Sequence, residues 1–197
     1  MGMKIPKRRK FMCFHKNKQL SDVVKECEQI FEMMKSETAC FTGHRSQKLP
    51  WKFNEQDERC IAMRAKAKEL IEEAIKNGYV NFISGMALGF DMICAELVLE
   101  LKEKYPHIKL ICAIPCKTQS NPWHADQQKR YQKILKQADI KRYISNEYTD
   151  TCMHERNDYM LKNSSLVIAL YNGTFGGTQS TLKKAEKMGL KVEIIKP

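Results

Sequence analysis

Short apolar runs alternate along the chain with longer stretches whose apolar residues recur every three or four positions. The short runs predict strands buried on both faces, and the longer stretches predict amphipathic helices. The expected strands are 39–41, 79–83, 108–114, 140–144, 166–170 and 192–195, and the expected helices are 56–76, 90–104, 123–137 and one from about residue 178. Alternation of this kind is typical of a parallel sheet with helices on both faces. We therefore predict an α/β fold.

The same pattern assigns faces and ends to these elements. The helix 56–76 is expected to bury Ile61, Ala65, Leu70, Ala74 and Ile75. The strand 108–114 is expected to stop at Pro115, and the last helix is expected to carry Leu182, Ala185 and Met188 on one face. The two helix faces follow from a 3.6-residue helical repeat.

The first 36 residues precede the alternating pattern. Residues 1–19 read as a basic arm, and residues 20–36 as an amphipathic helix with apolar residues at Leu20, Val23, Val24, Cys27, Ile30, Phe31 and Met34. This helix must bury its apolar stripe on the main domain or on a second copy, so a homo-oligomer through the helix is one expectation. The expected organisation is therefore an arm (1–19), a helix (20–36) and one main domain (38–197).

Composition changes this picture little. A chain of 197 residues is long enough for one domain with a proper core. The net charge of +11 indicates a polyanionic or phosphorylated partner, but 7 of the 34 Lys and Arg residues lie in the first 18 positions. Part of the excess charge therefore belongs to the arm and not to the folded domain.

Other sequence features bear on the environment of the protein. No apolar run reaches the roughly 18 residues of a membrane helix, and no segment of signal-peptide type follows the basic start. The eight cysteines lack the spacing of a disulfide framework, and Cys13 and His15 with Cys27 or Cys40 match no zinc-finger spacing. We expect a reduced, cytoplasmic protein with no membrane partner, no metal and no cofactor.

Three polar loops follow predicted strands. They are Thr42–Arg45, Ser84–Asp91 and the glycine-rich Tyr171–Thr178. In a parallel sheet these loops meet at the carboxyl edge, where ligands bind. The last loop opens a helix, and glycines at a helix start let backbone N–H groups approach an anion. A nucleotide phosphate is the expected ligand. Alternatively, the glycines only make a tight turn between strand and helix.

Several residues of these loops are candidates for ligand binding. Arg45 and Arg156 would anchor phosphate or ribose, because a guanidinium group suits phosphate oxygens. The hydroxyls of Thr42, Ser84 and Thr178 can bond phosphate, cap helices, or do both. The backbone positions expected to shape the pocket are Gly43, Gly85, Met86, Ala87, Gly89, Gly173, Gly176 and Gly177.

The remaining candidates have alternative interpretations. His44 could be a general acid or a hydrogen-bonded structural residue, and Asp91 could hold a ribose hydroxyl or favour a helix start. Glu96 could face the site or the solvent. Asn157 and Asn172 could bond a base or ribose, or could stabilise loops. Trp123 could close over a base or pack in the interior.

The loop residues in combination resemble the YpsA-type proteins of the SLOG superfamily. The resemblance rests on Ala39–Arg45 with Lys48-Leu49-Pro50, on Ile83–Asp91, on Arg156-Asn157 and on Gly176-Gly177-Thr178, and it covers roughly residues 38–197. It implies a Rossmann-like domain that binds a nucleotide or nucleotide-derived ligand. It does not imply an activity.

Two more distant resemblances suggest alternatives. Met153–Arg156 with the following glycine loop is similar to the cytokinin-activating phosphoribohydrolases, which cleave a nucleotide glycosidic bond with an arginine and a glutamate. Arg156 matches the arginine, but the glutamate position is Thr181, which cannot act as a carboxylate. An enzyme of this type would need the charge of Asp91, Glu96 or Glu155, so the candidate catalytic residues are Arg156, Asp91 and Glu96.

The second distant resemblance is to the DNA-loading protein of natural transformation. Its Ser-Gly-x-Ala-x-Gly-x-Asp motif resembles Ser84–Asp91. It implies single-stranded DNA binding, which requires a basic groove with aromatic stacking platforms. The leading hypothesis remains a module that senses or sequesters a nucleotide-derived small molecule; nucleotide N-glycosidase activity and nucleic-acid binding are the alternatives.

Overall fold

The structure is a computed structural model that describes residues 20–197. The expected basic arm 1–19, including Cys13 and His15, lies outside the described residues. The first helix, α1 (Leu20–Ser36), has no buried side chain, and large apolar residues such as Val24 and Phe31 are about half exposed on it. The described part of the chain divides into two units, with the boundary between residues 32 and 33, and the second unit (residues 33–197) contains the whole sheet.

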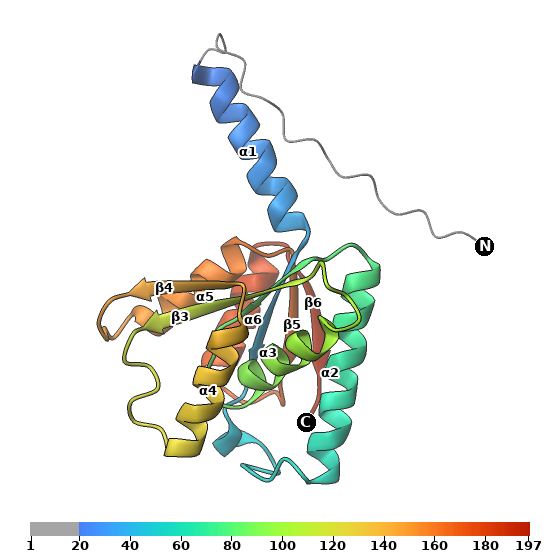
Figure 1. Cartoon of the computed structure of the whole chain (residues 1–197), viewed down its shortest axis with the longest axis vertical. Helices are drawn as coiled ribbons and strands as arrows, with labels where there is room; N and C mark the ends of the chain where they lie inside the picture. Colours follow the sequence, from blue (N-terminus) through green and yellow to red (C-terminus); the bar gives the residue numbers. More distant parts are fainter. Residues whose placement is uncertain (1–19) are drawn as a thin grey trace, which may run out of the picture. The chain divides into compact units, whose positions relative to one another are not determined.

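The second unit is an α/β domain in which helices and strands alternate (Figure 1). Its strands are β1 (Thr38–Gly43), β2 (Asn81–Ser84), β3 (Lys109–Cys116), β4 (Ile140–Ser145), β5 (Leu166–Leu170) and β6 (Lys191–Ile195). Its helices are the short 3₁₀ helix η1 (Ser46–Lys48), α2 (Glu58–Lys76), α3 (Phe90–Leu101), α4 (Ala125–Gln137), α5 (Cys152–Lys162) and α6 (Gly177–Lys187). All paired strands run parallel, in the order β4-β3-β2-β1-β5-β6. The predicted Rossmann-like α/β fold is confirmed.

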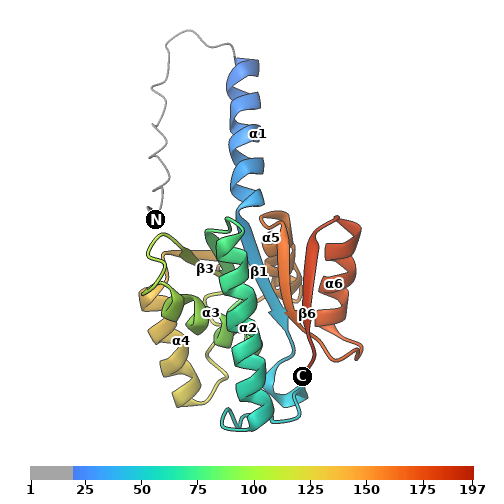
Figure 2. The same ribbon diagram turned by 90° about the vertical axis from the view of Figure 1, so that its right-hand side faces the viewer.

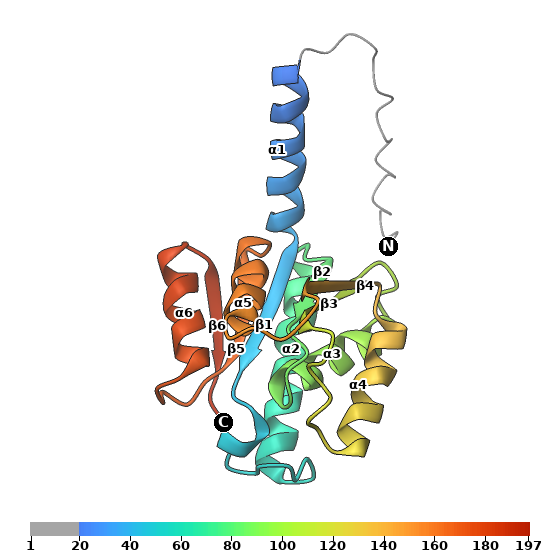
Figure 3. The same ribbon diagram turned by 90° about the vertical axis from the view of Figure 1, so that its left-hand side faces the viewer.

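Helices cover both faces of the sheet. Figures 2 and 3 show α5 and α6 on one side of the strands and α3 and α4 on the other. The larger apolar core lies under α2, α3 and α4 and contains Phe41, Phe82 and Phe90; the smaller one lies under α5 and α6 and contains Met160 and Leu182. The inner strands are buried from both sides, which explains their uninterrupted apolar runs.

The strand order reverses between β1 and β5. From β1 the chain builds the sheet outward through β2, β3 and β4, and it then returns to pair β5 with the free side of β1. The loops that follow β1 and β5 therefore leave the sheet in opposite directions. A reversal of this kind opens a crevice at the carboxyl edge of an α/β sheet.

The predicted buried face of α2 is partly wrong. Ile61 is 51% exposed and Ala65 is also exposed, whereas Cys60, Met63 and Ala67 point into the core. Asp57 caps the start of the helix, and its carboxylate accepts a hydrogen bond from the Arg59 N–H group. Both faces of the first two turns carry apolar residues, and packing against α3 selects the face that starts at Cys60.

Pro115 does not end the third strand as predicted, because β3 runs to Cys116. The neighbouring strand β2 ends opposite Cys112, so Pro115 lies where one side of β3 has no ladder partner. A residue without an N–H group is tolerated at such a position.

Two other expectations of burial are corrected at the edges of the domain. The edge strand β4 is largely exposed, with Ile140 46% and Tyr143 42% accessible, and β6 is only partly buried. Met188 comes just after α6 and is 38% exposed, whereas Leu182 and Ala185 are buried. An edge strand has only one neighbouring strand, so its side chains are less covered than those of the inner strands.

Within residues 20–197, no helix combines the length and the apolar character that crossing a membrane requires. The seven cysteines in this part of the chain are free thiols, and six of them are buried.

Candidate functional site

A cavity of about 500 Å³ lies at the carboxyl edge of the sheet, at the reversal between β1 and β5. We call it the edge pocket. It is lined by Thr42, Gly43, His44, Arg45, Gln47, Lys48, Ala87, Asp91, Met153, His154, Arg156, Asn157, Gly176, Gly177 and Thr178. The three polar loops therefore converge, together with the first turns of α5.

The edge pocket contains most of the candidate residues, but not all of them. Of the expected ligand-binding residues, those outside its lining are Ser84, Gly85, Met86, Gly89, Asn172 and Gly173. Of the expected catalytic residues, Arg156 and Asp91 line it and Glu96 does not. The lining residues that the sequence did not suggest as ligand contacts are Gln47, Lys48, Met153 and His154.

The start of helix α6 forms one wall of the edge pocket. The first hydrogen bond of the helix runs from the Ser180 N–H group to the Gly176 carbonyl. The N–H groups of Gly177, Thr178 and Gln179 therefore have no acceptor within the helix, and no side chain caps this end. A Cβ added at Gly177 would meet nothing within 4 Å, so the space in front of this helix end is open.

Arg156 crosses the floor of the pocket as a buried cation. It comes from the first half of α5 and is only 6% exposed. Its Nη1 donates to the Gly85 carbonyl and lies 3.4 Å from the Asp91 carboxylate. Its Nε group is buried and has no hydrogen-bond partner within the described part of the chain. A buried donor without an acceptor is costly, and the guanidinium group to which it belongs lines the edge pocket.

The charges of Asp91 and Arg156 reflect this burial. Loss of hydration raises the pKa of Asp91 to about 6, although Arg156 and the Ala87 N–H group favour the ionised form. Burial likewise lowers the pKa of Arg156, and Asp91 opposes that shift. The pocket floor therefore holds a carboxyl group that titrates closer to neutral pH than an exposed aspartate does.

Within the Ser84–Gly89 loop only Ala87 lines the edge pocket, and the other residues support its floor. The Ser84 hydroxyl is buried, donates to the Asp91 carbonyl and accepts from the Met86 N–H group. Met86 is buried in a left-handed conformation with φ of 56°, which is unusual for a residue other than glycine. Gly89 has φ of 96°, and a Cβ there would lie 2.9 Å from the His44 carbonyl.

His44 and Asn172 stabilise the loop after β5. The His44 Nε2 atom accepts a hydrogen bond from the Asn172 N–H group at 3.3 Å, and the Asn172 side chain accepts from the N–H and hydroxyl groups of Thr174. Burial lowers the pKa of His44. These contacts fit the structural interpretation of each residue, and His44 also lines the pocket.

Thr181 occupies the position at which the phosphoribohydrolase motif has a glutamate. Its hydroxyl donates to the Gly177 carbonyl and accepts from the Asn157 side chain at 3.0 Å. Thr181 is 6% exposed and does not line the pocket. It therefore joins α5 to α6 and contributes no charge.

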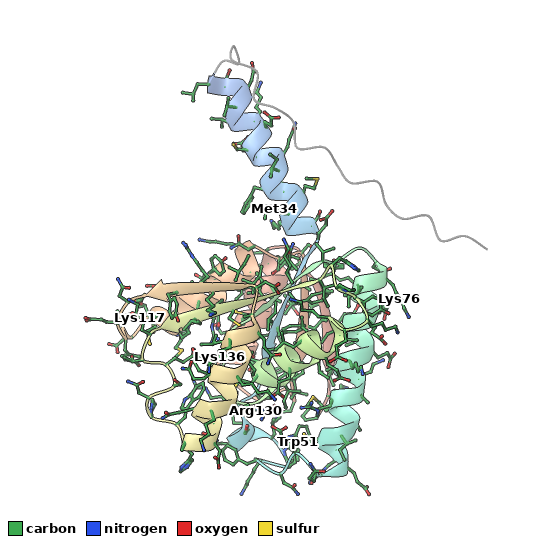
Figure 4. All side chains as sticks on the ribbon, in the orientation of Figure 1. Met34, Trp51, Lys76, Lys117, Arg130 and Lys136 are labelled. Carbon is green, nitrogen blue, oxygen red and sulfur yellow. The ribbon has the colours of Figure 1, made fainter. Side chains whose placement is uncertain are left out.

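Glu96 lies in a separate cluster of charged residues. Its carboxylate accepts two hydrogen bonds of 2.6 Å from Arg130, which also bonds Glu55 and projects from α4 (Figure 4). Arg64 lies 3.5 Å from Glu55 and 3.6 Å from Glu96. The cluster ties α2, α3 and α4 to the segment that precedes α2.

The domain matches a known family. The YpsA family model, described as the YspA SLOG family, matches residues 39–196. The SPbeta prophage-derived protein YoqJ of Bacillus subtilis is 36% identical over 140 residues, which cover 64% of this chain and 82% of that protein. A UPF0398 protein of Brevibacillus brevis is 33% identical over 129 residues, covering 58% of this chain and 66% of its relative.

Solved structures with a similar fold are more distant in sequence. The DNA processing protein A of Helicobacter pylori, whose structure is described by its single-stranded DNA binding mode, superimposes with a TM-score of 0.58 and 20% identity over 84% of this chain and 67% of that chain. DNA processing protein A (DprA) of Streptococcus pneumoniae gives a TM-score of 0.56 and 15% identity over 83% of this chain and 51% of that chain. At these identities the likeness concerns the fold alone.

Proposed function

This chain belongs to the YspA SLOG family, and from that premise we propose that its edge pocket binds the phosphate of a nucleotide or nucleotide-derived ligand. The observation that carries the proposal is the unpartnered Nε group of Arg156, buried beside the open start of α6. A phosphate there would accept from the guanidinium group and from the free N–H groups of the helix.

Two further cations favour an anion at this position. Arg45 and Lys48 are exposed residues that line the same pocket, and the Nζ group of Lys48 comes within 3.2 Å of the position of a Cβ built on Gly176. Asp91 is the single acidic residue among the lining residues. The lining of the pocket therefore carries three cationic side chains and one acidic side chain.

The proposal is tested by thermal stabilisation and calorimetry with nucleoside monophosphates, because a ligand that binds only the native state raises the melting temperature. Arg45→Ala should weaken binding roughly tenfold, the loss of one charged hydrogen bond. Lys76→Ala removes the same charge from the exposed last turn of α2, outside the pocket, and should leave the affinity unchanged.

A second variant tests the role of the helix start. Gly177→Leu should retain the fold, because residue 177 faces open space, and should abolish binding by filling the position of the phosphate. Equal affinity in the wild type, Arg45→Ala and Gly177→Leu would remove the edge pocket as the site.

Nucleotide N-glycosidase activity is the second candidate, and the position of Asp91 favours it. Asp91 lines the pocket and could replace the missing glutamate, whereas Glu96 lies in the separate charged cluster and Glu155 bonds Thr151 on the exposed side of α5. Release of free base from nucleoside monophosphates, absent in Asp91→Asn, would establish this activity. Binding without base release would restrict the protein to sensing or sequestration.

Single-stranded DNA binding is the third candidate, and it is supported by the fold shared with the DNA processing proteins and by the Ser84–Asp91 motif. Binding to phosphates along a strand releases counterions, so the affinity for oligonucleotides should fall steeply with salt. Stabilisation by oligonucleotides and by no mononucleotide would replace the leading proposal with this one.

A further inference from the structure

A second cavity adjoins the edge pocket. It has a volume of about 590 Å³ and extends from the edge pocket toward the start of α4. The two cavities share four lining residues: Arg45, Gln47, Ala87 and Met153. The shared residues show that the two cavities are adjacent. Each volume lies in the range of roughly 300–1,000 Å³ that small ligands use.

The two cavities differ in charge. The edge pocket is lined by four charged residues: Arg45, Lys48, Asp91 and Arg156. The second cavity has one Asp, Glu, Lys or Arg residue in its lining, Arg45, which both cavities share. The second cavity is lined instead mainly by aromatic, amide and apolar side chains, together with Thr118 and His124. A ligand with an anionic end and a neutral, flat end would match this division.

Three aromatic rings line the second cavity. Phe53 is 54% exposed and Tyr148 is 63% exposed, so both rings have area available for a ligand. Trp123 packs edge-on against Tyr131, with 5.3 Å between the ring centroids, which fixes its orientation. Ring faces of this kind stack on any nucleobase.

Amide side chains provide hydrogen-bonding groups beside these rings. Gln119 is buried and holds the Ser84–Gly89 loop by donating to the carbonyls of Met86 and Gly85, at 3.1 and 3.4 Å. Gln47 and Asn121 also line the cavity, and their side chains make no hydrogen bond to another described residue. Such amides can bond the edge of a base, as donors and as acceptors.

The Gly85 carbonyl accepts hydrogen bonds from a lining residue of each cavity. It accepts from Arg156, which lines the edge pocket, and from Gln119, which lines the second cavity. The same loop therefore positions the cation of one cavity and the amide of the other.

We propose that the second cavity receives the base of the nucleotide whose phosphate occupies the edge pocket, with Phe53, Trp123 and Tyr148 as its stacking surface. This inference rests on the proposed phosphate site. It defines the ligand class as a nucleotide carrying an intact base, and it excludes a sugar phosphate or an isolated phosphate as the preferred ligand.

The experiment compares AMP, GMP, CMP and UMP with ribose 5-phosphate by titration calorimetry on the full chain. The wild type should bind at least one of the nucleotides about fivefold or more tightly than ribose 5-phosphate, the gain expected from stacking one base. The double variant Phe53→Ser, Tyr148→Ser should lose this preference and retain its affinity for ribose 5-phosphate. Both rings are more than half exposed, so their removal should leave the fold intact.

Tyr143→Ser is the matched control, because Tyr143 is a partly exposed aromatic residue on β4 that lines neither cavity. It should keep the preference for the nucleotide. The base subsite would be overturned, with the phosphate proposal unaffected, by either of two results. One is equal affinity of the wild type for ribose 5-phosphate and for every nucleotide. The other is a double variant that prefers the nucleotide as strongly as the wild type does. Binding of neither class would overturn both proposals.

Discussion

A Cβ atom added to Gly85 would lie 1.9 Å from Nη1 of Arg156, so these two residues can hold their positions only while residue 85 is glycine. The same Cβ would lie 2.8 Å from the Asp91 carboxylate. The absent side chain lets a buried guanidinium group reach the Gly85 carbonyl and the carboxylate together.

Gly85→Ala should therefore destabilise the protein by about 1–3 kcal/mol, the usual effect of overpacking a filled interior. Gly177→Ala is the matched control: its Cβ meets nothing within 4 Å, and its stability should change by no more than about 1 kcal/mol. Urea denaturation measures both changes. Equal stability of the two variants would mean that Arg156 moves away from Gly85 without cost.

The pKa of Asp91, raised by burial to about 6, predicts a pH dependence of stability. The folded protein holds the proton of Asp91 more tightly than the unfolded chain, where the pKa is near 3.8. The contribution of Asp91 to the free energy of unfolding is therefore fully present below pH 3.8 and is lost as the pH rises through about 6.

The measurement is urea denaturation of the wild type and of Asp91→Asn at intervals from pH 4 to pH 7.5. Between these limits the wild type should lose stability relative to the variant, whose amide does not titrate. Asp91→Asn also removes the carboxylate beside Arg156, so the readout is the slope with pH and not the absolute stability. Parallel profiles would contradict the raised pKa.

Glu96→Gln should reduce stability and leave ligand affinity unchanged. Glu96 pairs with Arg130 in the charged cluster and lies outside the edge pocket. Its side chain is 30% exposed, so the expected loss is about 1 kcal/mol. Glu100→Gln, on the same helix and paired with Lys68 at the surface, should lose less. A large loss of nucleotide affinity in Glu96→Gln would contradict this prediction and would make Glu96 a candidate residue of the ligand site.

The apolar residues of α1 predict self-association. Val24 and Phe31 lie seven positions apart on one face of the helix and are each 47% exposed. Replacing both with serine should lower the oligomeric state measured by sedimentation velocity and should leave ligand affinity unchanged. Ile61→Ser, which removes an exposed apolar side chain from α2, is the control. A wild type that sediments as a monomer would contradict the prediction.

The alternation of apolar runs and helical repeats was enough to predict the parallel sheet, because burial on both faces requires uninterrupted apolar strands. Since parallel strands end at a common edge, the polar loops after β1, β2 and β5 could be assigned to one edge before any contact was known. The pattern does not determine which face of α2 is buried, because Cys60 and Ile61 are adjacent and both are apolar. Packing against α3 buries Cys60 and leaves Ile61 exposed.

Tertiary structure alone decided which polar residues face the edge pocket. Glu96 lies five residues beyond Asp91 on α3, about 1.4 turns, so the two carboxylates leave the helix in different directions. Asp91 faces Arg156, and Glu96 faces Arg130. The close approach of Gly85 to Arg156 joins positions 71 residues apart, and no local pattern records it. The hydrophobic pattern is therefore enough to predict the sheet and the edge at which its polar loops meet. Long-range packing decides which charged side chains line the edge pocket, that the Nε group of Arg156 is buried, and that an aromatic cavity adjoins the pocket.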